Sequence, residues 1–151
     1  MQTRIKLILV VFLLVGVFGC GANDEAPPPT PTELAEDLLV GNWTLDNGGH
    51  ILVDGQDVGV NYPGFELSLS FFVTKEDRYE TINAGSLFKP FGIWSWGGFN
   101  NNNNLTFNLD DLQSISIVNL TDSTFNFTFQ FAGTGGTANG VGGNYDILLV
   151  R

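Results

Sequence analysis

Phe125-Asn126-Phe127-Thr128-Phe129-Gln130-Phe131 places a phenylalanine at every second position of the chain. Successive side chains of a β-strand point to opposite faces of the sheet, so these four rings would lie on one face. Alternation of this kind predicts a strand with one buried and one solvated face. The same period of two recurs from residue 43 to the end of the sequence.

Seven further segments carry apolar side chains at this spacing. Counting residues 43–53 as one strand bent at Gly48-Gly49 gives eight strands in all, separated by turn residues such as Asp54-Gly55. We therefore expect an all-β, antiparallel, up-and-down eight-stranded barrel, with a closed sandwich as the alternative. The seven segments are Phe65/Leu67/Leu69/Phe71, Leu105/Phe107/Leu109, Tyr145/Ile147/Leu149, residues 43–53, residues 79–82, Trp94/Trp96 and Ile115/Ile117.

A short helix is expected just before the first strand. Thr30-Pro31-Thr32-Glu33 has a capping threonine, a proline at the first helical position and a glutamate three residues after the cap. Leu34 and Leu38 then share one face. We predict a helix over residues 31–39.

A transmembrane barrel uses the same period of two and is the main alternative for the strands. Its strands run to about 9–11 residues with aromatic girdles at both rims. Most strands here are shorter, with the apolar residues of each on a single face. The pattern favours a barrel with an apolar interior.

The first nineteen residues have the features of an export signal. An apolar run over residues 7–19 follows Arg4 and Lys6 and stops at Cys20, the only cysteine. The run is shorter than the roughly 18 apolar residues that a spanning helix needs. Val17-Phe18-Gly19-Cys20 resembles a lipobox, which implies cleavage before Cys20 and acylation of that residue with chains such as palmitate.

This organisation predicts three parts. Residues 1–19 are a lipoprotein signal peptide, residues 20–32 are the acylated cysteine and a proline-rich linker, and residues 33–151 are the barrel domain. Proline-rich sequence favours extended polyproline II, so the linker would hold the domain off a membrane. We expect lipid anchoring at the outer membrane, on its periplasmic face or at the cell surface.

The charge of the chain opposes some classes of partner. The formal net charge is −10, and removing residues 1–19 leaves four basic against sixteen acidic residues, a charge of −12. Nucleic acids and anionic lipid surfaces are bound through basic patches. We expect neither as a partner of the domain.

Several segments together resemble the lipocalin-like domains of Gram-negative bacterial lipoproteins, over roughly residues 34–151. The resemblance implies a calycin-type barrel whose tryptophan, here Trp43, plugs the closed end. The second and third lipocalin motifs, including the arginine that packs over this tryptophan, are not evident in the sequence. The only candidate for that arginine near the end is the terminal Arg151, so lipocalin ligand specificity is not carried over. The segments are Gly41-Asn42-Trp43, Val53-Asp54-Gly55-Gln56-Asp57-Val58, Gly64-Phe65-Glu66-Leu67-Ser68-Leu69, Gly92-Ile93-Trp94-Ser95-Trp96 and residues 136–145.

The sequence offers little for catalysis or metal binding. His50 is the single histidine and has no second histidine or thiol with which to form a ligand set or a nucleophile–base pair. Asp54-Gly55 and Asp110-Asp111 are expected for turns. We expect no catalytic residues, no metal and no cofactor.

Two binding hypotheses remain open. In the first, large aromatic side chains line a barrel cavity for a small apolar ligand. In the second, rings fill the interior, and the loops at residues 83–91, 99–104 and 132–143 contact a protein or glycan. The candidate cavity residues are Trp43, Tyr79, Trp94, Trp96, Phe127 and Phe129.

Replacement of Cys20 tests the lipoprotein hypothesis. Cys20→Ser removes the acylated thiol, so we expect loss of both acyl labelling and membrane fractionation in the producing cell. Retention of both by the variant would contradict lipidation at this residue.

Overall fold

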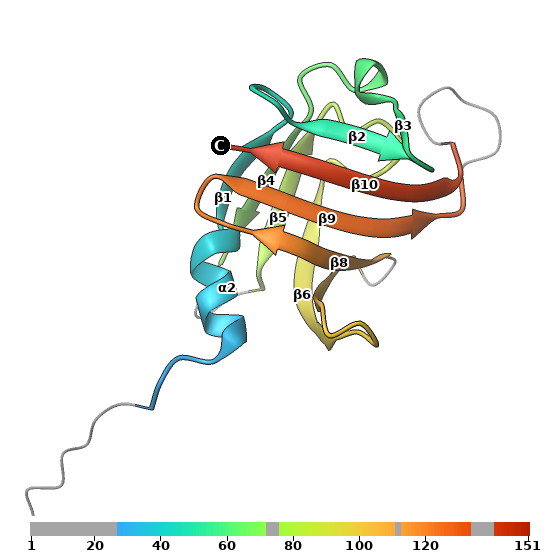
Figure 1. The fold of residues 1–151 in the computed structure, drawn as a ribbon. Helices are drawn as coiled ribbons and strands as arrows, with labels where there is room; N and C mark the ends of the chain where they lie inside the picture. The colour runs from blue at the N-terminus through green and yellow to red at the C-terminus, as the bar shows by residue number, and fades with distance from the viewer. Residues whose placement is uncertain (1–26, 72–75, 111–112, 134–140) are drawn as a thin grey trace, which may run out of the picture.

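The computed structural model describes residues 27–71, 76–110, 113–133 and 141–151. The predicted signal peptide, Cys20 and the linker up to residue 26 lie outside these ranges. Neighbouring strands pair antiparallel in chain order from β4 to β10, and β1 pairs with both β4 and β10. The predicted eight-stranded, up-and-down barrel is therefore confirmed, and it is closed (Figure 1).

The first barrel position is one strand bent in the middle. β1 (Gly41–Thr44) pairs with β4, whereas β2 (His50–Val53) pairs with β10. Between them the backbone takes positive φ at Asn47 (60°) and Gly48 (114°), conformations that favour asparagine and glycine. The bend predicted at the glycines is confirmed.

Two small elements were not predicted. They are a two-residue strand, β3 (Gln56–Asp57), paired with β2, and a 3₁₀ turn, η1 (Gly59–Asn61). The remaining strands are β4 (Glu66–Ser70), β5 (Arg78–Ile82), β6 (Phe91–Phe99), β7 (Leu105–Leu109), β8 (Gln113–Leu120), β9 (Thr124–Phe131) and β10 (Gly143–Val150).

Helix α2 (Pro31–Leu39) has the predicted bounds. The Thr30 hydroxyl accepts a hydrogen bond from the Glu33 N–H, and the Glu33 carboxylate accepts one from the Thr30 N–H, which completes the capping box. Within the described ranges, no helix has the length and apolar character needed to cross a membrane.

Inward positions follow the predicted alternation, with two exceptions. The alternation predicts Phe71 on the inward face, but this residue lies beyond the end of β4 and is 43% exposed. Ile82 is 53% exposed, because Thr81 takes the inward position on β5 and donates a hydrogen bond to the Lys89 carbonyl. A polar residue whose hydroxyl is satisfied can replace an apolar one inside the barrel.

One end of the barrel is closed by α2 and Trp43. The buried Trp43 indole N–H donates to the Leu39 carbonyl at 2.8 Å, and Leu39 itself is fully buried. The last carbonyls of a helix have no partner within it, so this bond supplies a partner and fixes the helix to the strand. A second bond, from Trp96 Nε1 to Glu36 Oε1 at 2.7 Å, joins α2 to β6.

Arg151 completes this closed end. Its guanidinium carbon lies 4.4 Å from the centroid of the Trp43 ring. Its Nη1 donates to the Val40 carbonyl at 2.9 Å, and its Nε donates to the Asp122 carbonyl at 2.5 Å. Gly41 has φ at 140°, a backbone conformation that favours glycine, and a Cβ there would lie only 2.7 Å from Arg151 Nη1. The candidate arginine therefore does lie over the tryptophan.

Removal of the Arg151 side chain should weaken the closed end measurably. Arg151→Met loses a cation–π contact and two hydrogen bonds at an exposed site, so we expect the free energy of unfolding to fall by about 1–2 kcal/mol in urea titrations. Arg78→Met is the matched control on an exposed strand position and should stay within about 0.5 kcal/mol of wild type. Equal decreases in the free energy of unfolding of the two variants would contradict a specific stabilising role of Arg151.

Candidate functional site: the loop end of the barrel

The end of the barrel opposite α2 carries the longer connections. The β5–β6 loop, residues 83–90, turns over this end and buries Ala84, Leu87 and Phe88. Its return to β6 is held by Thr81, whose N–H donates to the Pro90 carbonyl and whose hydroxyl donates to the Lys89 carbonyl, both at 2.8 Å. The loop is thus packed into the barrel.

Phe88 is the plug at this end. It is only 6% exposed, and its ring centroid lies 5.3 Å from that of Phe129, 6.2 Å from Phe65 and 6.5 Å from Phe127. Aromatic rings attract one another at these separations. A ligand deeper in the barrel would have to take the volume that Phe88 occupies.

Below Phe88 the interior is filled by rings in mutual contact. Phe107 touches Trp94, Phe125 and Phe127, with centroids 5.9–6.4 Å apart. Phe127 continues the contact to Phe129 at 6.2 Å. An eight-stranded barrel has an interior just wide enough for side chains to fill, and here the alternating phenylalanines of β9 do so.

A cleft of about 560 Å³ opens at the loop end, beside the plug. Such a volume lies within the range of small-molecule sites. Apolar walls come from the 83–90 loop, the end of β7 and the end of β9, and a lysine and a carboxylate supply the charges. The lining includes Tyr79, Leu87, Phe88, Lys89, Pro90, Leu109, Asp110, Gln130, Phe131 and Ala132.

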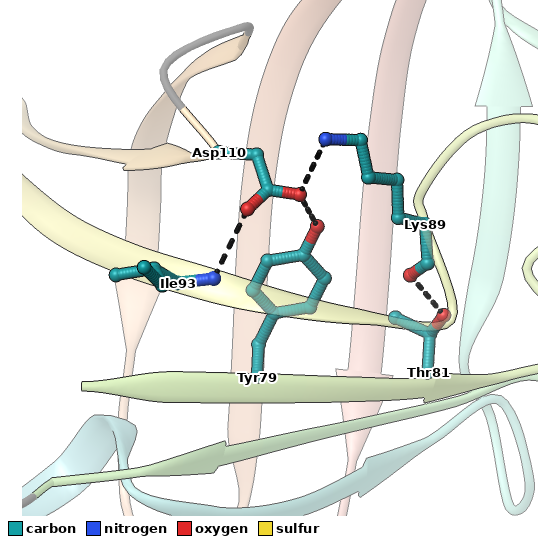
Figure 2. A network of polar contacts seen from close by, with 5 residues as sticks. All are labelled: Tyr79, Thr81, Lys89, Ile93 and Asp110. Atoms are coloured by element: carbon teal, nitrogen blue, oxygen red, sulfur yellow. Dashed lines mark hydrogen bonds and ion pairs between the residues drawn. The ribbon is translucent and has the colours of Figure 1, made fainter. Parts of the chain in front are cut away.

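Asp110 is the polar anchor of the cleft (Figure 2). Its Oδ2 accepts a hydrogen bond from the Tyr79 hydroxyl at 2.8 Å and lies 3.0 Å from the Lys89 ammonium. Its Oδ1 accepts from the Ile93 N–H at 3.1 Å. A Cβ at Gly92 would overlap this carboxylate, so glycine at 92 makes the room for it.

These contacts set the protonation of both acidic groups. Partial burial would raise the pKa of Asp110, but the bonds from Ile93, Lys89 and Tyr79 outweigh it and hold that pKa below its ordinary value of 3.8. The pKa of Tyr79 is raised, first by burial and then by the hydrogen bond to Asp110 and its charge. At neutral pH the phenol therefore stays protonated and the carboxylate ionised.

The Lys89–Asp110 pair separates two clefts. Tyr79, Lys89 and Asp110 also line a second hollow of about 470 Å³ on the outer side, next to Phe91 and Ile93. Lys89 is 58% exposed, whereas Asp110 is only 16% exposed. The lysine side chain is therefore mostly open to solvent, whereas the carboxylate that it pairs with is mostly covered by protein.

The structure distributes the six predicted cavity residues along the barrel. Trp43 and Trp96 lie at the helix end, where they bond to α2. Trp94 and Phe127 lie within the packed column of rings, and Phe129 contacts the plug. Of the six, Tyr79 alone lines the loop-end cleft. Five of the six belong to one buried hydrophobic core, Trp96 packs against it, and the open volume lies beside this core.

Phe88, Lys89 and Asp110 were missing from the predicted cavity residues. The sequence predicts the 83–91 loop as a contact loop and Asp110 as a turn residue. Asp110 does have a turn conformation, with φ at 50°. Its partners come from β5, β6 and the preceding loop, so no local sequence signal links them.

Comparisons with known protein families, curated proteins and solved structures found no match for this chain. The described residues include no group of three or more histidine, cysteine, aspartate or glutamate side chains placed to hold a metal ion. The case for the candidate site therefore rests on its geometry alone, which is that of a largely apolar cleft with one ion pair.

Lowering the pH should decrease the contribution of Asp110 to the free energy of unfolding. The pKa of Asp110 is lower in the folded than in the unfolded state, so its contribution to stability is complete above the unfolded pKa and is lost as the pH falls through the folded pKa. We expect the difference in free energy of unfolding between wild type and Asp110→Asn to be constant above about pH 5 and to shrink below about pH 4. A difference that is unchanged down to about pH 3 would contradict this role.

Proposed function

We propose that this chain is a non-enzymatic, lipocalin-like binding protein of the cell envelope that holds a small apolar molecule at the loop end of its barrel. The observation that carries the proposal is the cleft of about 560 Å³ beside Phe88. Its walls include Leu87, Leu109 and Phe131. An apolar ligand that binds there would exchange contact with water for contact with these apolar side chains, which is favourable.

Two features support the lipocalin-like part of the proposal. The first is the topology, an up-and-down barrel of eight strands that follows a short helix. The second is Arg151 over Trp43 at the end that the helix closes. Neither feature identifies the ligand, because proteins with the same fold can have unrelated functions.

The proposed location depends on the N-terminal sequence. Cys20 would carry acyl chains, and the segment up to Thr30 would act as a spacer between the outer membrane and the barrel. The described chain enters α2 directly after Thr30, and α2 closes one end of the barrel. A tether attached there leaves the loop end free to receive a ligand.

A closed-core interaction module is the second candidate. The packed interior favours it, since the rings from Trp94 to Phe129 already occupy the barrel. The two candidates differ in one simple respect. The wild-type protein binds a neutral apolar probe if the first is right, and binds none if only the loops act.

Substitution of a cleft wall tests the proposal. N-phenyl-1-naphthylamine, a neutral apolar fluorophore, should brighten on binding the wild-type protein. Phe131→Ser removes an apolar wall, so we expect its dissociation constant for the probe to rise by about tenfold, which corresponds to about 1.4 kcal/mol.

Phe99→Ser is the matched control. Phe99 is 54% exposed at the end of β6 and does not line the cleft, so its loss should leave probe affinity within about twofold. Equal affinity in Phe131→Ser and wild type, or an absence of probe binding in wild type, would contradict the proposed site.

A further inference from the structure

A second hollow lies on the outer surface of the barrel, away from the plug. β8, β9, β10 and β2 lie side by side, and Figure 1 shows them on the face toward the viewer. A groove of about 550 Å³ crosses these four strands. We call this hollow the outer groove.

The register of the strands places polar side chains in a straight row along the outer groove. Ser116 lies opposite Thr128, Thr128 opposite Asp146, and Asp146 opposite Leu52. Directly opposed side chains have Cβ atoms about 4.5–5.5 Å apart. The row therefore offers two hydroxyls, a carboxylate and one aliphatic surface at regular spacing.

Hydrogen bonds hold Asp146 and Ser116 of this row, and Asp54 beside it, in place. Asn126 Nδ2 donates to Asp146 Oδ1 at 2.7 Å, and Asn144 donates to Asp54 Oδ1 from its N–H at 3.1 Å and from Nδ2 at 3.0 Å. Asn100 Nδ2 donates to the Ser116 hydroxyl at 3.0 Å. Polar groups that are fixed before binding lose less conformational entropy when a ligand arrives.

Asp54 and Asp146 each have one carboxylate oxygen that can accept a hydrogen bond from a ligand. In the described part of the chain, Oδ2 of Asp54 and Oδ2 of Asp146 accept no hydrogen bond from another residue. Both side chains line the groove. A ligand that brings hydroxyl donors can satisfy them with charge-assisted hydrogen bonds.

The charge of the groove narrows the class of ligand. Its lining contains two aspartates and no lysine or arginine, so phosphate, sulfate and carboxylate groups would be repelled. Its remaining polar atoms are hydroxyls and amides, which both donate and accept. Leu52 gives an apolar surface for the C–H face of a ring.

We infer that the outer groove is a second binding site, for a neutral saccharide whose hydroxyls span Thr128, Asp146 and Asp54. The inference is independent of the apolar ligand proposed above, because it uses the outer faces of strands. Gln130 lines both hollows, so the residues chosen for the test, Thr128 and Asp146, are ones that do not line the loop-end cleft.

The test uses the purified protein on an array of immobilised neutral and acidic oligosaccharides, with titration of the neutral oligosaccharides that bind. Thr128→Val removes one hydroxyl at constant shape, and Asp146→Leu removes the carboxylate. Each should raise the dissociation constant about tenfold, as expected for loss of a hydrogen bond to a charged or fixed polar group.

Glu66→Leu is the matched control, because Glu66 faces outward on β4 outside the groove. Neutral glycan binding that is kept in Glu66→Leu and weakened in the two groove variants supports the inference. Four outcomes would overturn it: no glycan binding by wild type, a preference for sulfated or sialylated glycans, a requirement for added calcium, or equal binding by all variants.

Discussion

The contact between Trp43 and the end of α2 is the constraint on which the rest of the barrel depends. The indole fills the interior at one end, donates to a helix carbonyl, and carries the Arg151 guanidinium on its outer face. These bonds join the first strand, the helix and the last strand at one point. A barrel closed at this end can receive a small molecule only at the other end or on its outer surface.

The period-two alternation then determines where open volume remains. Inward rings on β6, β7 and β9 fill the central part of the barrel, and Phe88 from a loop covers them. The packed rings leave little room inside, so the two clefts beside the Lys89–Asp110 pair lie where strands end and loops meet them. Asp110 links the last part of β7 to β5, β6 and the plug loop, and so holds the shape of the cleft.

The strands and the helix could be predicted because their signals are local. Alternation identified the inward side chains, and the capping box identified the start of α2. Phe71 was misplaced because its strand ends one residue earlier, and Ile82 because the polar Thr81 turns inward. The cleft could not be predicted, since its walls come from segments far apart in sequence.

The central claim is that the ligand lies at the loop end of a barrel whose interior is already packed. A crystal structure of the protein purified from the cells that produce it, without delipidation, tests this most directly. The account predicts additional electron density in the cleft against Phe131, with Phe88 and the ring column in place. Density among the interior rings, with Phe88 displaced, or a cleft that contains only water, would contradict it.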